Sequence, residues 1–178
     1  MEQQTDQELI VRALAGDRSA FNPLVERYQR AVYLVARRML RDHDLADEVA
    51  QEAFVKAYFN LAKYDSSYRF YTWIVRITMN LCYDTLKKHR REAPLELAAG
   101  KFSDDDPLEQ AVQTDSCQRI RDEIDRLPRE QREVLLLRVD RELSYQEISA
   151  VLRIPIGSVM SRLFRARQKL SHSLKDIA

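Results

Sequence analysis

The residues best suited to contacting a ligand lie in the segment 68–91, YRFYTWIVRITMNLCYDTLKKHRR, which holds the only tryptophan of this 178-residue chain. In a helix of about 3.6 residues per turn, positions three and four apart share one face. One such face carries Trp73, Arg76, Asn80, Tyr83 and Lys87. Rings stack on unpaired bases, cations contact phosphates and an amide reads a base edge. The pattern therefore predicts contact with single-stranded nucleic acid.

The opposite face of this helix is apolar and predicts packing against a core. It carries Phe70, Ile74, Ile77 and Leu81. An alternative stays open for the aromatic face, because rings on the outer side of a helical pattern are often covered by tertiary contacts. In that alternative, Trp73 and Tyr83 pack under a neighbouring loop and the helix is an ordinary amphipathic one.

The elements that must position these residues are predicted to be helices, because the sequence has three glycines and no sustained β-branched alternation. A capping box of Thr5 and Glu8 predicts a first helix over 5–15, and Gly16 is predicted to end it. A second helix is predicted over 20–41. Its apolar stripe consists of Leu24, Tyr28, Val32, Val35 and Met39.

The third predicted helix opens at Asp44 and is apolar on two sides. One side carries Leu45, Val49, Ala53 and Ala57, and the other carries Phe54, Val55, Tyr58 and Phe59. Such a helix either lies at the centre of a bundle or shares one side with a partner, and both interpretations stay open. A polar loop over 63–69 then leads into the aromatic helix.

Charge is distributed unevenly although the formal net charge is only +1. Residues 94–118 contain acidic side chains, proline, glycine and a single cation, Lys101, which predicts a flexible acidic linker. From Arg153 to Lys175 every charged residue is a cation. The neutral total therefore conceals an acidic middle and a basic end that is suited to an anionic partner.

The remaining segment, 119–178, predicts short helices that end in a helix-turn-helix. A capping box of Ser144 and Glu147 opens one short helix, the residues 153–157 form a tight break, and a strongly basic helix follows. The inward side of that last helix is predicted to consist of Val159, Leu163, Ala166 and Leu170. Its outward side carries serines and arginines, which suit a major groove. The alternative is a basic amphipathic helix that merely caps the domain.

Composition also limits the other classes of function. His43, His89 and His172 are isolated from nucleophile or ligand patterns, Cys82 and Cys117 lack metal-ligand spacing, and no glycine-rich phosphate loop is present. We therefore expect no enzyme, no catalytic residue, no metal site and no cofactor. No long apolar run and no cleavable signal occur, so the sequence predicts a cytoplasmic chain without membrane insertion.

Four segments together resemble the sigma-70 family of bacterial transcription initiation factors, in its short extracytoplasmic-function (ECF, group IV) branch. They are DLADEVAQEAFVKAY, FYTWIVRITMN, LPREQREVLLLR and LSYQEISAVLRIPIGSVMSRLFRARQKL, and the resemblance covers about 20–92 and 119–174. It implies an all-α fold of two small helical domains. Residues 1–93 would be a region 2 domain, 94–118 the acidic linker and 119–178 a region 4 helix-turn-helix domain.

The resemblance implies that the chain binds core RNA polymerase, through the β′ clamp coiled coil and the β subunit, and directs promoter-specific initiation. An anti-sigma factor would be a further partner. The implied polymerase-binding residues are Asp47, Gln51, Glu52 and Phe54. Those implied for recognising and melting the −10 element are Tyr64, Ser66, Tyr68, Phe70, Tyr71, Trp73, Arg76, Asn80, Tyr83 and Lys87. Those implied for reading the −35 duplex are Ser158, Ser161, Arg162, Phe164, Arg165 and Arg167.

One position departs from the family pattern, because many members carry a basic residue where this chain has Met160. Met160 lies near the edge of the groove-facing arc, where a change of residue type can alter the −35 preference, and the sequence does not define the promoter. The rival class is a stand-alone helix-turn-helix regulator whose N-terminal domain senses a ligand or dimerises. It predicts tight duplex binding without polymerase, and it leaves Trp73, Tyr83 and the two-sided helix unexplained.

Overall fold

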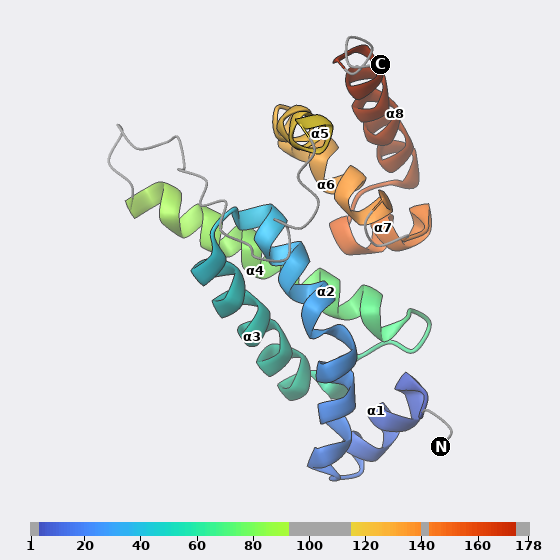
Figure 1. Ribbon diagram of the computed structural model, residues 1–178. Coiled ribbons are helices and arrows are strands. Elements are labelled where there is room, and N and C mark those ends of the chain that lie inside the picture. The colour runs from blue at the N-terminus through green and yellow to red at the C-terminus, as the bar shows by residue number, and fades with distance from the viewer. Residues whose placement is uncertain (1–3, 93–114, 140–142, 174–178) are drawn as a thin grey trace. The chain divides into compact units, whose positions relative to one another are not determined.

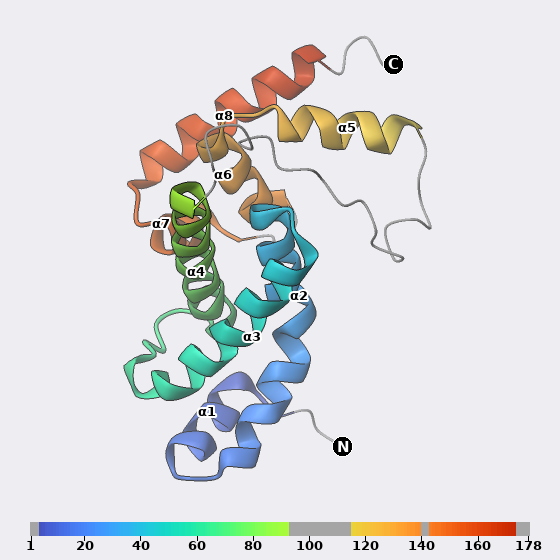
Figure 2. The same cartoon turned by 90° about the vertical axis from the view of Figure 1, so that its left-hand side faces the viewer.

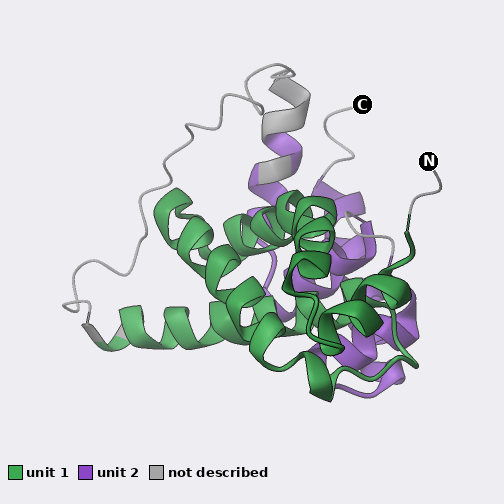
Figure 3. Ribbon diagram, turned by 90° about the horizontal axis from the view of Figure 1, so that it is seen from below, with its two compact units in different colours: residues 1–102 green, residues 103–178 purple. Residues whose placement is uncertain are grey.

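The structure is a computed structural model that describes residues 4–92, 115–139 and 143–173 (Figures 1 and 2). Within these ranges the chain forms helices and no strand, which confirms the predicted all-α fold. Its internal contacts divide it into two compact units, 1–102 and 103–178 (Figure 3). Most of the predicted acidic linker, 94–114, lies outside the described residues. The part of the chain that the structure describes contains no helix long and apolar enough to cross a bilayer.

Unit 1 is a bundle built on three long helices. Its elements are α1 (Asp6–Leu14), the 3-10 helix η1 (Arg18–Phe21), α2 (Asn22–Leu40), α3 (His43–Phe59), the 3-10 helix η2 (Leu61–Lys63) and α4 (Phe70–Glu92). The helix α3 returns alongside α2, and α4 packs against both (Figures 1 and 2). The stripe predicted for α2 is buried except for the half-buried Tyr28, so it forms the centre of this bundle.

Local hydrogen bonds explain where these helices begin. The predicted capping box is present at α1, where Thr5 Oγ1 accepts from the backbone N–H of Glu8 and the Glu8 carboxylate accepts from that of Thr5. Gly16, at φ +102°, follows the C-cap Ala15 and takes the left-handed conformation that ends the helix region.

The third helix begins earlier than predicted. Its N-cap is Asp42, whose carboxylate accepts from the backbone N–H of Leu45 at 2.9 Å, and Asp44 lies inside the first turn. The reason lies upstream, because Arg41 ends α2 in the left-handed conformation (φ +60°) and Asp42 then takes an extended backbone. That geometry leaves the Asp42 side chain free to cap.

Unit 2 consists of shorter helices. They are α5 (Asp115–Asp125), α6 (Arg129–Val139), α7 (Tyr145–Leu152) and α8 (Ile156–Ser173). The helix α5 begins inside the stretch predicted as linker. The capping box of Ser144 and Glu147 opens α7 as predicted.

The turn between α7 and α8 is the tight break that the sequence predicted. Arg153 takes the left-handed conformation at φ +53°, and Ser149 Oγ donates to the carbonyl oxygen of Ile154 at 2.6 Å. The carbonyl oxygen of Pro155 then accepts from the N–H groups of Ser158 and Val159. This turn fixes the direction in which α8 leaves α7.

The core of unit 2 is aliphatic. Val159, Leu163 and Ala166 of α8 are buried, and the half-buried Leu170 packs against the cluster around Leu127 and Leu135. The inward side predicted for the last helix is therefore confirmed. The Glu133 carboxylate is also buried, and it accepts a hydrogen bond from Arg129 Nε at 2.6 Å.

Candidate nucleic-acid interface

The rings predicted to face single-stranded bases are largely buried in unit 1. Trp73 is 7% exposed, and Phe70 and Tyr71 are buried as well. The Trp73 ring lies 5.4 Å from the Tyr64 ring and 5.7 Å from the Phe70 ring, centroid to centroid. Tyr64 belongs to the segment between η2 and α4, so the structure selects for Trp73 the alternative in which it packs under a neighbouring loop.

Behind this layer, Tyr28 of α2 supports the same rings. Its ring stacks on Tyr71 at 5.6 Å and lies 5.7 Å from Phe70. The Tyr28 hydroxyl donates to the Asp6 carboxylate at 2.5 Å, and Arg27 also pairs with Asp6. Partial burial and the hydrogen bond to Asp6 raise the pKa of Tyr28 to about 12.

Hydrogen bonds within the loop that precedes α4 hold its conformation. The Tyr64 hydroxyl donates to the carbonyl oxygen of Tyr68 at 2.5 Å, which closes the loop over its own chain. Asp65 Oδ1 accepts from the backbone N–H of Ser67 at 2.9 Å. Hydrogen bonds from the backbone and the side chain of Ser67 lower the pKa of Asp65. Ser66 and Tyr68 remain exposed on this ordered loop.

Along α4 the predicted residues differ in accessibility. Asn80 and Lys87 are exposed, whereas Arg76 and Tyr83 are half-buried. The surface of unit 1 that can contact a base or a phosphate therefore consists of the loop tip and the polar side of α4. The buried rings form the wall beneath it.

The residues predicted to bind polymerase lie on α3. Asp47, Gln51 and Glu52 are exposed, whereas Phe54 is buried in the bundle. Two residues from the same predicted apolar side were not singled out, Val55 and Phe59, and both are exposed, with Phe59 at 78%. Both interpretations of the two-sided helix thus hold in part, because one side is core and a piece of the other side stays uncovered.

On α8 the outward residues are largely where the sequence placed them. Ser161, Arg165 and Arg167 are exposed, Ser158 is half-buried and the Phe164 side chain is 67% exposed. Arg162 differs, because its guanidinium is half-buried and pairs with the Glu130 carboxylate of α6 at 2.9 Å. The sequence pattern placed Arg162 beside the groove-facing residues, but it gave no signal of this partner on another helix.

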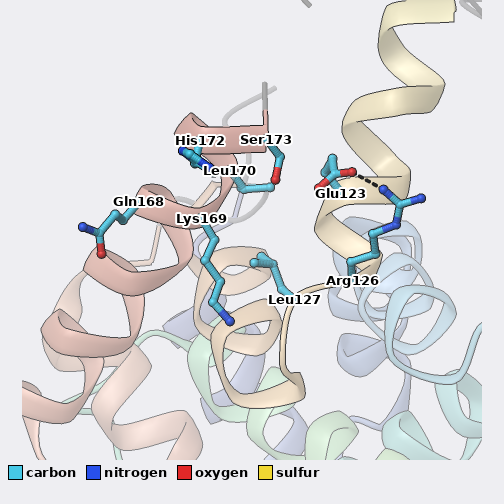
Figure 4. A pocket seen from close by; sticks show the side chains of 8 residues that line it. All are labelled: Glu123, Arg126, Leu127, Gln168, Lys169, Leu170, His172 and Ser173. Carbon is cyan, nitrogen blue, oxygen red and sulfur yellow. Dashed lines mark hydrogen bonds and ion pairs between the residues drawn. The ribbon is translucent and has the colours of Figure 1, made fainter. Parts of the chain in front are cut away.

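Unit 2 also has a pocket of about 420 Å³ between α5 and α8 (Figure 4). Its lining residues are Glu123, Arg126, Leu127, Gln168, Lys169, Leu170, His172 and Ser173. Glu123 and Arg126 pair with each other at its edge, as the dashed line in Figure 4 shows. Among the described residues no group of His, Cys, Asp and Glu is placed to hold a metal ion.

Comparison with known proteins gives two family matches in this order along the chain. The description "Sigma-70 region 2" matches residues 24–92, and "Sigma-70, region 4" matches residues 117–170. The first match contains α3, the loop and α4, and the second contains the helix-turn-helix of α7 and α8.

Individual relatives span nearly the whole chain. An RNA polymerase sigma-H factor of Pseudomonas aeruginosa is 34% identical over 98% of this chain and 96% of that protein. An ECF RNA polymerase sigma-E factor of Escherichia coli K12 is 35% identical over 99% of this chain and 97% of that protein. Among solved structures, that of CnrH in complex with the cytosolic domain of CnrY is 26% identical with a TM-score of 0.72. It covers 97% of this chain and 99% of CnrH.

Proposed function

This chain belongs to the sigma-70 family of RNA polymerase sigma factors, in its ECF branch, and we propose that its two units divide the promoter between them. As a member of the family, it binds core RNA polymerase and directs promoter-specific initiation. We assign the −10 element to unit 1 and the −35 element to unit 2. The observation that carries the assignment is α8, whose apolar side builds a core while its other side exposes arginines and a ring.

In unit 2, α8 enters the major groove of the −35 duplex as the second helix of a helix-turn-helix. The exposed Arg165 and Arg167 contact guanine edges or phosphates, and Ser158 and Ser161 allow close approach of the helix. Arg162 reaches DNA only after it leaves Glu130. That exchange costs little, because a partly exposed ion pair contributes about 0–1 kcal/mol.

In unit 1, the loop 64–69 and α4 hold the separated strand of the −10 element. The exposed Tyr68 offers a stacking surface, Asn80 offers an amide to a base edge, and Lys87 contacts the backbone phosphates. Unstacking a base costs a few kcal/mol, which stacking of about 1–3 kcal/mol per base offsets. Trp73, Phe70 and Tyr71 contribute by shaping the wall behind the loop, with limited contact to the bases themselves.

Docking on the polymerase uses the exposed side of α3. Asp47, Gln51 and Glu52 face solvent and suit the cationic and polar side chains of a coiled coil, the β′ clamp in this proposal. The exposed Val55 and Phe59 extend that surface with an apolar part, which a partner can bury.

A second protein partner completes the proposal. CnrH was solved in complex with the cytosolic domain of another protein, CnrY, and it matches this chain over nearly its whole length. We infer that an anti-sigma factor covers the polymerase-binding or DNA-binding surfaces of this chain until a signal releases it. The polymerase partner places the protein in the cytoplasm, where it acts by binding and without covalent catalysis.

The test is run-off transcription with purified core RNA polymerase and a pool of genomic promoter fragments, with and without the protein. Discrete transcripts that appear only with it are expected, and Asn80→Ala should weaken them. Asn80 is preferable to Trp73 here, because it is exposed and its loss leaves the core intact. Gln7→Ala, which removes an exposed amide on α1, is the matched control and should transcribe like the wild type.

One outcome would favour the rival class. If polymerase ignored the protein while the protein alone shifted duplex DNA, the stand-alone helix-turn-helix regulator would be correct. The polar side of α4 would then be ordinary solvated surface.

A further inference from the structure

An apolar row runs along the exposed side of α8, and the proposed arginine contacts do not use it. Ile156, Met160 and Phe164 follow one another at four-residue steps and are 41%, 53% and 67% exposed. Residues four apart lie on neighbouring turns of one helix face, so the three side chains form a continuous ridge. A solvated helix face normally carries charge and amide instead.

The fold holds this ridge in a fixed orientation. Val159, Leu163 and Ala166 are buried in the core of unit 2, which sets the rotation of α8 about its axis. Ile156 is the first residue of α8, directly after the turn that Arg153 and Pro155 shape. In a helix-turn-helix, the N-terminal residues of the second helix contact the base edges. The ridge therefore lies where base readout takes place.

The charge around the ridge indicates what covers it. Arg165 and Arg167 are exposed beside Phe164, and no acidic residue occurs between Arg153 and Lys175. An apolar ridge in a segment whose charged residues are all cations fits a polyanion that presents apolar groups. The major groove of duplex DNA is such a surface, because phosphates border it and the 5-methyl group of thymine projects into it.

The arginine nearest to Met160 in sequence is directed elsewhere. Arg162 follows Met160 by two residues, but its guanidinium pairs with Glu130 at 2.9 Å. While Arg162 stays paired with Glu130, a guanine opposite Met160 meets a thioether rather than a bidentate donor. That environment favours a methyl group over a polar base edge.

We propose that α8 reads the 5-methyl groups of thymine through Met160 and Phe164, with Ile156 extending the contact at the start of the helix. This inference rests on the assignment of the −35 duplex to unit 2. It makes Met160 a specificity-determining residue. The base preference opposite the ridge is then thymine, while Arg165 and Arg167 supply affinity.

The experiment uses holoenzyme formed from the full chain and core RNA polymerase. A promoter that it transcribes is taken from the genomic pool, and thymines of the upstream duplex element are replaced one at a time by deoxyuridine, which removes only the methyl group. The −10 element stays unchanged, and deoxyuridine in the spacer is the control. Removing a methyl group that contacts the ridge should lower the affinity about fourfold, the factor that corresponds to about 0.8 kcal/mol per buried methylene-sized group.

The variants separate methyl readout from general binding. Met160→Gln, nearly isosteric but polar, and Phe164→Ala should each lose the preference for thymine over deoxyuridine at the position that the substituted residue contacts, and keep it at the other. Met160→Leu keeps an apolar side chain and should keep the preference. Arg165→Ala should weaken binding to both templates by the same factor. Met160 and Phe164 are exposed, so these changes leave the core of unit 2 intact.

Failure of the inference is distinct from failure of the proposed function. If the wild-type holoenzyme transcribes but tolerates deoxyuridine at every upstream position, methyl readout is wrong and the sigma-factor role stands. The same conclusion follows if Met160→Gln and Phe164→Ala retain the wild-type sensitivity to deoxyuridine. If no promoter is transcribed with the wild-type protein, the proposed function itself fails, and the inference fails with it.

Discussion

The helices α4 and α8 both combine aromatic rings with cations, but the rings of α4 are buried in unit 1 and the ring of α8 is exposed on unit 2. Trp73 of α4 lies under Tyr64, against Phe70, and is almost fully covered. Phe164 of α8 projects from the helix with most of its ring exposed. The residue types are alike, and the difference comes from what packs around each helix.

That difference separates two ways of building a nucleic-acid surface. In unit 1, α4 packs against α2 and α3, and its rings hold a loop whose backbone and tip make the surface. In unit 2, the core is aliphatic and α8 keeps most of its outer side, including Arg165 and Phe164, exposed for side-chain contact. We therefore expect changes to the rings of unit 1 to alter stability, and changes to the ring of unit 2 to alter binding.

The largest expected effect tests the difference between the buried ring of unit 1 and the exposed ring of unit 2 most directly. Trp73→Ala should lower the free energy of unfolding of unit 1 by about 3–5 kcal/mol, because a buried ring is lost and a cavity remains. Phe164→Ala should change stability by no more than about 0.5 kcal/mol, since the ring is exposed. Urea unfolding followed by far-ultraviolet circular dichroism measures both variants, because Trp73→Ala removes the only tryptophan. Equal stability of the two variants would contradict the distinction between the units.

The next effect tests the support behind the rings of unit 1. Asp6→Ala removes the acceptor of the Tyr28 hydroxyl and the partner of Arg27, so Tyr28 is held less firmly against Phe70 and Tyr71. We expect a loss of about 1.5–3 kcal/mol in the free energy of unfolding, the range for hydrogen bonds to a charged group. Thermal unfolding measures it.

Glu52→Ala is the matched control for Asp6→Ala. Glu52 forms an exposed pair with Lys56 at 2.8 Å on α3, and such a pair contributes about 0.3–0.5 kcal/mol. If both carboxylate deletions cost the same, the contact of Asp6 with Tyr28 would be no more than a surface interaction.

A smaller effect concerns the loop rather than the core. Tyr64→Phe keeps the ring against Trp73 but removes the hydroxyl that donates to Tyr68, a hydrogen bond worth about 0.5–1.5 kcal/mol. We expect open-complex formation on duplex promoters to slow by a few fold, while a template already unpaired at the −10 element restores most of the rate. Tyr68→Phe, which keeps both the ring and the backbone acceptor, is the control. An unchanged rate in Tyr64→Phe would show that the hydroxyl does not hold the loop.

The smallest effect is a dependence on alkaline pH. The pKa of Tyr28 is raised to about 12 in the folded chain, above its ordinary value near 10, so the folded protein binds the phenolic proton more tightly. The stabilising contribution of this proton is complete below about pH 10 and is lost as pH rises through about 12.

The measurement is the difference in free energy of unfolding between wild type and Tyr28→Phe, followed from pH 8 upward. This difference should shrink above about pH 10, because only the wild type has the Tyr28 phenol to ionise. Tyr68→Phe, which changes an exposed ring, should show no such trend. A difference that stays constant with pH would mean that Tyr28 does not couple to folding.

Features that depend on residues close together in the sequence were predictable from the sequence. Both capping boxes, at Thr5 and Ser144, were placed correctly because their hydrogen bonds span three residues. The buried stripe of α2 and the inward side of α8 followed from helical periodicity. The segments that resemble the sigma-70 family likewise follow from the order of residues alone, and the matches to regions 2 and 4 confirm them.

Tertiary structure alone decided which outward-facing residues stay exposed. Periodicity states on which side of a helix a residue lies, but not what covers that side. Trp73 is covered by a loop, Phe54 by the bundle, and Arg162 is drawn to Glu130 on another helix. The residues in these contacts are separated along the chain, and they meet only when the helices pack. The sequence by itself thus determined the helices and their inner sides, and packing decided which of the remaining side chains are available to a partner.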